Sequence, residues 1–181
     1  RGHPMAGFDG YVDEASTEAR VLRDVFAPGD AWFRTGDLLR RDADGDFWFV
    51  DRLDDVVRTP SGPVFTRRVE DLLYRRADVR MVAVHALEGD PGAVAATIVP
   101  RGELLDLARL EDLIAEKLAP RERPRVLVVA DAIPMTDGYR PLKRALRERG
   151  VERARAVFER GDDGRYRPRE GRIDPGAPRA E

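Results

Sequence analysis

The stretch from residue 30 to residue 54 has the apolar and polar pattern of a β-hairpin. Its first strand leads to an Asp44-Gly45 turn, and residues 47–50 return with the aromatic and β-branched residues that suit a pleated surface. Antiparallel pairing brings the two ends of a hairpin together. Asp37, near the start, and Arg52, near the end, are therefore expected to lie at the same end of this hairpin.

Helical spacing of apolar residues predicts a short amphipathic helix before the hairpin, from Glu14 to Phe26, which Pro28-Gly29 ends. Thr66 and Asp106 are the predicted N-caps of two later helices. Beyond the hairpin the predicted order is strand, strand, helix, strand, strand, helix, strand, helix, over residues 56–58, 64–65, 66–76, 81–87, 93–100, 106–120, 125–129 and 141–149.

This order predicts an α+β fold, with a small domain from residue 53 to 150 that has a central sheet and about three helices. A terminal hairpin is expected to turn over Asp162-Asp163-Gly164. From Pro168 onward the Pro, Gly and Arg content predicts disorder. The predicted domain limits are 1–52, 53–150 and 151–181.

Composition narrows the classes of function. A formal net charge of −2 over 181 residues argues against broad electrostatic capture of nucleic acid. The chain has no cysteine, which excludes a disulfide or a thiol nucleophile within it. Its apolar runs are too short for a transmembrane helix or a signal peptide. With two histidines, of which His85 is expected to pack in an apolar strand, the sequence argues against a zinc site.

Three motifs carry a family resemblance. Thr35-Gly36-Asp37 is followed after the hairpin by Asp51-Arg52-Leu53-Asp54-Asp55, and residues 136–143 read Thr-Asp-Gly-Tyr-Arg-Pro-Leu-Lys. Together they resemble the adenylate-forming enzymes, which include acyl-CoA synthetases, luciferases and peptide-synthetase adenylation domains. The runs Trp-Phe-Arg-Thr-Gly-Asp-Leu and Phe-Val-Asp-Arg resemble one branch, the fatty-acid transport protein / very-long-chain acyl-CoA synthetase family. The resemblance covers residues 7–167.

The resemblance implies a ligase that works in two steps. A fatty acid and ATP, bound as MgATP, give an acyl-adenylate and pyrophosphate, and coenzyme A then displaces AMP. Residues 1–52 would be the end of a large AMP-binding domain, and residues 53–150 the mobile small domain. The chain would be part of a longer enzyme, or a truncated relic of one. The acyl pocket and most of the ATP site would lie upstream, so the chain alone is expected to be inactive.

By the same resemblance, Asp37 receives the ribose hydroxyls, Arg52 contacts the ribose and phosphate region, and Asp54 is the hinge. A carboxylate accepts two hydroxyl donors at once, and the planar fork of arginine suits phosphate oxygens. The residues alone also fit plainer roles. Asp37 would then be a turn residue that bonds its own backbone, Arg52 a solvated strand-end arginine, and Asp54 an exposed linker residue.

Two motifs depart from the family pattern. In the loop that would line the pantetheine tunnel, Ser61 and Gly62 are followed by Pro63, which fixes a torsion and removes an amide. Arg140 occupies the position of the adenylation lysine, and Lys143 is its rival for the catalytic role, although a solvated helix-face lysine is the simpler interpretation. Loss of a positioned charge at a developing oxyanion costs about 10²–10³ in rate, so weak adenylation is predicted.

Two other functions fit the same sequence. One is a non-catalytic, degenerate module that binds nucleotide or a partner protein, which the altered loop and Arg140 favour. The other is an adenylating enzyme that loads a carrier-protein thiol in place of coenzyme A. A cytoplasmic location is expected, with any membrane association arising from segments outside this chain.

Overall fold

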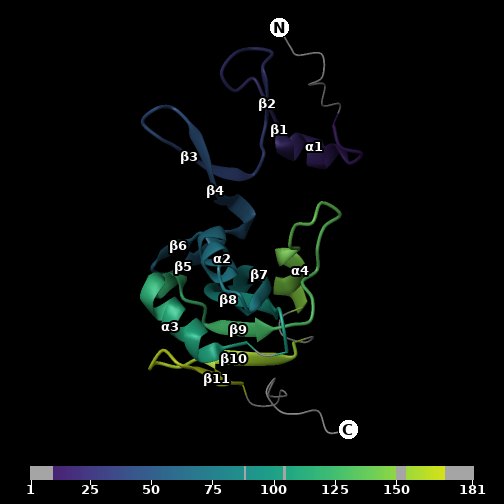
Figure 1. Ribbon diagram of the computed structural model, residues 1–181. Coiled ribbons are helices and arrows are strands. Elements are labelled where there is room, and N and C mark those ends of the chain that lie inside the picture. Colours follow the sequence, from purple (N-terminus) through teal and green to yellow (C-terminus); the bar gives the residue numbers. More distant parts are fainter. Residues whose placement is uncertain (1–9, 88, 104, 150–153, 170–181) are drawn as a thin grey trace. The chain divides into compact units, whose positions relative to one another are not determined.

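The computed structural model describes residues 10–87, 89–103, 105–149 and 154–169. The chain divides into two compact units, residues 1–37 and 38–181, which are described separately. Figure 1 shows the elements of both units, coloured along the sequence.

The first unit contains a short helix and a small antiparallel pair of strands. Helix α1 (Glu14–Arg20) begins after Asp13, whose carboxylate accepts from the Ser16 amide at 3.1 Å. Strand β1 (Val21–Arg23) pairs with β2 (Ala31–Phe33). The prediction of a helix as far as Phe26 is therefore wrong beyond Arg20, because residues 21–23 bond to a strand partner that a local pattern does not reveal.

The predicted hairpin is confirmed. Strand β3 (Asp37–Arg41), which enters the second unit at Leu38, pairs with β4 (Phe47–Arg52). Asp42 closes the turn, since its side chain accepts from the amides of Asp44 at 3.1 Å and Asp46 at 2.9 Å.

The rest of the second unit is built on one five-stranded sheet in the order β11-β10-β9-β8-β7 (Figure 1). Its strands are β7 (Val79–Leu87), β8 (Asp90–Pro100), β9 (Val126–Val129), β10 (Ala156–Arg160) and β11 (Tyr166–Pro168). Only the β8–β9 pair is parallel. A parallel pair needs a crossover, and helix α3 (Leu107–Lys117) supplies it.

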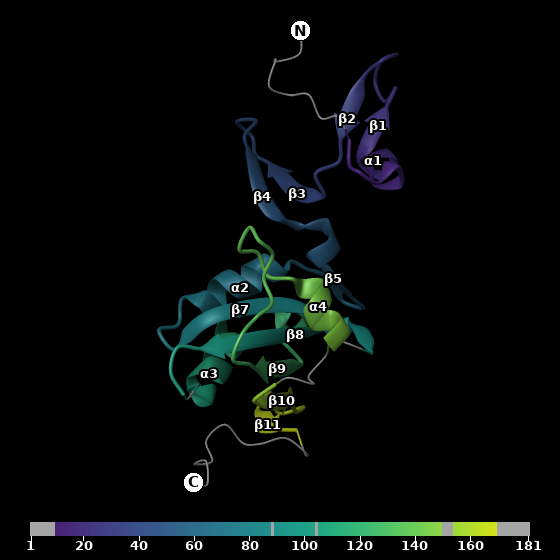
Figure 2. The same cartoon turned by 90° about the vertical axis from the view of Figure 1, so that its right-hand side faces the viewer.

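Helices cover both faces of this sheet. Helix α2 (Thr66–Tyr74) and α3 bury Val69, Leu73, Leu110 and Ile114 with alternate strand residues such as Val82 and Val84. Helix α4 (Lys143–Arg149) lies beside β7 (Figure 2), and its Leu146 joins Ala83, from the opposite side of the strand, in a second cluster. The alternation along β7 thus decides which helix each residue meets.

The predicted α+β fold is confirmed, including a central sheet and three helices after residue 53. The short elements between hairpin and sheet are the 3-10 turn η1 (Leu53–Asp55), β5 (Val57–Thr59) and β6 (Gly62–Val64). A second 3-10 turn, η2 (Pro120–Glu122), follows α3.

The terminal hairpin over 162–164 forms as β10–β11 and extends the main sheet. The predicted limits at 52/53 and 150/151 stay predictions. Most of the predicted disordered tail, residues 170–181, lies outside the described residues.

Two predicted helix starts are corrected. Asp106 caps α3 as expected, accepting from the Arg109 amide at 3.1 Å. Thr66, however, is the first residue of α2 and not its cap. Helix α4 begins at Lys143 and not at Pro141, because the Leu142 amide donates to the Pro134 carbonyl at 2.8 Å and Pro141 forms a bridge with Met135.

His85 is packed in β7, as the sequence predicts, and is 3% exposed. Its Nε2 lies 3.0 Å from Thr97 Oγ1, and its Nδ1 lies 2.8 Å from the Ala86 carbonyl oxygen. Burial lowers the pKa of His85 to about 4, against the raising effect of the Ala86 carbonyl, and the positive charges of Lys143 and Arg147 lower it further. His85 is therefore neutral in the folded protein at pH 7.

We predict that His85 makes the fold acid-sensitive. The unfolded chain takes up a proton on this imidazole near pH 6.5 and the folded chain only near pH 4, so stability is complete above pH 6.5 and falls as the pH drops toward 4. Between pH 7 and pH 5 this group should remove about 2 kcal/mol of unfolding free energy. Urea titrations of His85→Gln should lose this part of the pH dependence, whereas His3→Gln should retain it. An equal pH dependence in both variants would contradict the assignment.

Candidate functional site

The residues predicted to hold a nucleotide lie at the ends of the β3–β4 hairpin strands. Asp37 is the first residue of β3, and its amide donates to Thr35 Oγ1 at 3.1 Å. Arg52 is the last residue of β4, and its amide donates to Asp51 Oδ1 at 2.8 Å. That the two side chains together bind a ribose stays a prediction.

The predicted hinge lies in η1, directly after β4. Asp54 is exposed, and its backbone carbonyl accepts from Arg147 Nη1 at 3.3 Å. A guanidinium of α4 thus holds the main chain of this turn. Whether the chain pivots at Asp54 stays a prediction.

The loop predicted to face the pantetheine is the tight β5–β6 hairpin. Thr59 pairs with Gly62, and Thr59 Oγ1 donates to the Gly62 carbonyl at 2.7 Å and accepts from the Ser61 amide at 3.2 Å. Gly62 has φ +112°, while a Cβ added there would meet nothing within 4 Å. Glycine is therefore needed for its backbone conformation and not for space. Pro63 is accommodated in β6 opposite Arg58.

Arg140 and Lys143, the two candidates for the adenylation cation, lie in different environments. Arg140 is exposed at the end of a tight loop in which its carbonyl accepts from the Thr136 amide at 2.8 Å and its amide donates to Thr136 Oγ1 at 3.1 Å. Tyr139, just before it, has φ +57° and is 87% exposed. The loop therefore presents the Arg140 guanidinium to solvent.

Lys143, in contrast, is only 7% exposed. Its Nζ donates to Thr66 Oγ1 at 2.7 Å and lies 2.8 Å from Glu70 Oε1 and 3.7 Å from Asp55 Oδ2. The interpretation of Lys143 as a solvated helix-face lysine is wrong. It shares a face of α4 with the buried Leu146 three residues on, and that face points inward.

Asp51 completes this group from the hairpin side and is 2% exposed. Its carboxylate accepts from Thr66 Oγ1 at 3.0 Å and from the Arg67 amide at 3.3 Å. A carboxylate at the first turn of a helix satisfies a free amide and meets the positive end of the helix dipole. Asp51 thus fills the capping role that the sequence assigned to Thr66.

We call Asp51, Asp55, Thr66, Glu70 and Lys143 the Lys143 cluster. The Thr66 hydroxyl is its centre, since it donates to Asp51 and accepts from Lys143. Glu70 is also fixed, because its Oε1 accepts from the Val84 amide at 2.7 Å. Sequence reasoning missed the partners of Lys143. The available signal was the i, i+4 spacing of Thr66 and Glu70, which places both side chains on one face of α2.

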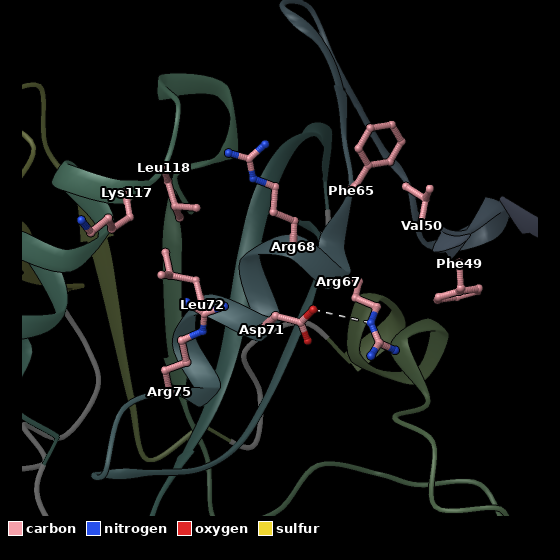
Figure 3. A pocket seen from close by; sticks show the side chains of 10 residues that line it. All are labelled: Phe49, Val50, Phe65, Arg67, Arg68, Asp71, Leu72, Arg75, Lys117 and Leu118. Atoms are coloured by element: carbon pink, nitrogen blue, oxygen red, sulfur yellow. Dashed lines mark ion pairs between the residues drawn. The ribbon is translucent and has the colours of Figure 1, made fainter. Parts of the chain in front are cut away.

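A separate pocket of about 390 Å³ lies between the hairpin and the α2–α3 face (Figure 3). Two of its arginines are already engaged. Arg67 lies over the Phe49 ring at 5.5 Å and pairs with Asp71 at 3.6 Å, and Arg68 pairs with Glu122 at 3.5 Å. None of the predicted site residues line this pocket. Its lining is Phe49, Val50, Phe65, Arg67, Arg68, Asp71, Leu72, Arg75, Lys117 and Leu118.

Two further findings concern the described residues alone. In this part of the chain, no helix combines the length and the apolar character needed to cross a membrane. Within the same residues, no group of three or more His, Cys, Asp or Glu side chains is arranged to hold a metal ion.

We predict that Lys143 is a structural charge. Lys143→Met should lower the unfolding free energy by about 3–5 kcal/mol, because the Glu70 carboxylate, whose side chain is only 15% exposed, would be left without its cation. Arg144→Met is the matched control. Arg144 is exposed and pairs with Glu148 on the surface, so its loss should change stability by under about 1 kcal/mol. Equal losses in urea denaturation of the two variants would contradict the prediction.

No family model matches the sequence. Among curated proteins, the very long-chain fatty acid transport protein of Saccharomyces cerevisiae is 35% identical over 156 residues, which is 80% of this chain and 23% of the relative. The medium/long-chain fatty-acid–CoA ligase of Mycobacterium tuberculosis is 37% identical over 139 residues, which is 71% of this chain and 24% of the relative. The chain thus spans about a quarter of the length of these curated relatives.

Solved structures agree in fold. The o-succinylbenzoate–CoA synthetase of Bacillus subtilis, in complex with AMP, is 26% identical with a TM-score of 0.62, over 74% of this chain and 26% of the other. The amide bond synthetase of Marinactinospora thermotolerans is 32% identical, also with a TM-score of 0.62, over 77% of this chain and 28% of the other.

Proposed function

Because the chain matches the carboxy-terminal portion of the adenylate-forming superfamily, we propose that it works as the end of an ATP-dependent long-chain or very-long-chain fatty acid–CoA ligase. The rest of the ligase would be a large amino-terminal region like that of its relatives. The proposal rests on the hairpin motifs and the Arg140 loop occurring together. Asp37, in Thr35-Gly36-Asp37, begins one hairpin and Asp51-Arg52 ends it, and the sheet that follows is accompanied by an exposed loop that carries Arg140.

The proposed substrates are a fatty acid, ATP and coenzyme A. Relatives named for fatty acid transport and for fatty-acid–CoA ligation support the acyl substrate and the thiol acceptor. A further structure of the B. subtilis enzyme, in complex with ATP and magnesium ion, supports ATP. We propose that magnesium enters with ATP, held largely by the phosphates.

In this proposal the chain's own residues bind and orient the nucleotide. The Asp37 carboxylate accepts both ribose hydroxyls, and the Arg52 guanidinium donates to the ribose and phosphate oxygens. Asp54 absorbs the rotation of the small domain between adenylation and thioester formation. Ser61 and Gly62, in the β5–β6 turn, would then approach the pantetheine.

The uncovered aromatic surface of the hairpin supports a larger body around it. Phe47, Trp48 and Phe49 are consecutive residues of β4, and each is at least 45% exposed within this chain. Leu39 on β3 is also exposed. Exposed apolar patches of this kind mark surfaces that another body covers. We propose that the amino-terminal region covers them.

A second candidate function is a non-catalytic module that binds nucleotide or a partner protein. Arginine at position 140 favours it, since guanidinium is longer, planar and differently hydrated from the ammonium it replaces. Acceptor assays with coenzyme A and with a carrier-protein thiol separate the possible enzymes. Inertness toward both, with AMP still bound, would support the module.

The Arg140→Lys exchange tests the adenylation step. In the protein with its amino-terminal region, we predict that this variant raises fatty-acid-dependent ATP–pyrophosphate exchange about tenfold or more, because a compact ammonium restores the positioned charge. Arg144→Lys, an exposed position on the following helix, should leave exchange unchanged. Exchange that Arg140→Lys fails to raise would remove Arg140 from the adenylation site.

Loss of the Asp37 carboxylate tests nucleotide binding. We predict that Asp37→Asn lowers AMP affinity about tenfold or more in calorimetric titration of the same protein, because two charge-assisted bonds to the ribose are weakened. Asp44→Asn, in the hairpin turn, is the control and should bind AMP as the parent does. Affinity that is indifferent to Asp37 would overturn the proposed nucleotide site.

A further inference from the structure

The segment from Asp51 to Asp55 is tied to later parts of the chain at three points. The Asp51 carboxylate accepts from the Thr66 hydroxyl and the Arg67 amide. The Asp54 carbonyl accepts from Arg147, and Asp55 lies 3.7 Å from the Lys143 ammonium. The turn at Asp54, which we propose to rotate, therefore has contacts to later parts of the chain both before and after Asp54 in this structure.

These ties differ in whether a rotation at Asp54 would break them. Asp55 and Lys143 both follow the pivot, so they would move together and their ion pair would persist. Asp51 precedes the pivot, whereas Thr66 and Arg67 follow it. A large rotation at Asp54 must therefore separate the Asp51 carboxylate from the start of α2.

We propose that the contact between the Asp51 carboxylate and the Thr66 hydroxyl is a latch that selects one orientation of the small domain. Lys143 is the positioning residue of this latch. Its ammonium donates to Thr66 Oγ1 at 2.7 Å, and an oxygen with one hydrogen then directs that hydrogen to Asp51. The inference rests on the proposed function for its role in the reaction, but the latch itself is a property of this chain.

Burial makes the latch a two-state device. Asp51 is 2% exposed and Thr66 is fully buried, so a half-open contact would leave Oδ2 of the carboxylate without water and without its donors Thr66 and Arg67. The contact is therefore either made or fully released to solvent. This property suits an enzyme whose two half-reactions need two discrete orientations.

The latch can be tested by spin labelling, since the chain has no native cysteine. Ala43→Cys, in the hairpin turn, and Ala108→Cys, on α3, are both exposed and lie on opposite sides of the pivot. Pulsed electron spin resonance on the labelled 181-residue chain should give one main distance. Thr66→Val removes the hydroxyl at nearly equal volume and should shift the ratio of the two orientations about tenfold or more, as a broader or second distance peak.

Thr66→Ser keeps the hydroxyl and is the matched control, with the parent distance expected. Asp51→Asn removes the charge at equal shape and should give the broadened distribution, which provides the same test if Thr66→Val does not fold. Unchanged distributions in folded Thr66→Val or Asp51→Asn would overturn the latch. The distance measurement does not require enzymatic activity, so its result tests the latch independently of the proposed ligase function.

The functional arm uses the protein with its amino-terminal region. Thr66→Val should change the ratio of pyrophosphate exchange to acyl transfer from preformed acyl-adenylate about tenfold or more, and Thr66→Ser should restore the parent ratio. A merely structural role for Thr66 would lower both rates together and leave their ratio unchanged. That result, with broadened distances, would overturn the role of the latch in the reaction.

Discussion

The buried ammonium of Lys143 is the interaction on which the arrangement of the second unit depends. It reaches from α4 to α2, and through the Thr66 hydroxyl to the end of the hairpin. The ammonium forms ion pairs with the carboxylates of Asp55 and Glu70, and Glu70 also accepts from a β7 amide. Such a group is stable only while every member is satisfied. It therefore links the end of the hairpin to helices α2 and α4.

This arrangement gives the two proposed roles of the segment a common physical basis. Arg52 and Asp54 follow Asp51 within three residues, so the proposed nucleotide contact and the proposed pivot lie directly beside the proposed latch. The same helix α4 that supplies Lys143 and Arg147 follows the loop that presents Arg140. The proposed hinge and the loop that carries Arg140 are thus both adjacent to one short helix.

Local pattern and family resemblance predicted most of the architecture but little of the cluster. The hairpin, the order of elements from β5 to α4 and the packed state of His85 follow from strand periodicity, turn residues and helix caps. The end of α1 at Arg20 does not, because Val21–Arg23 pair with the next strand, Ala31–Phe33, which the helical spacing does not reveal. The prediction of a solvated Lys143 was wrong for a similar reason. Its neighbours Leu142 and Arg144 are both exposed, and its burial depends on Glu70 and Thr66, more than 70 residues away.

The central claim is that Asp37 and Arg52 hold the sugar side of an adenylate. The most direct measurement is a crystal structure of the protein, with its amino-terminal region, bound to a non-hydrolysable acyl-adenylate analogue. The account predicts both ribose hydroxyls within hydrogen-bond distance of the Asp37 carboxylate, and the Arg52 guanidinium on the ribose and phosphate oxygens. An analogue bound with its ribose away from this hairpin would contradict the account.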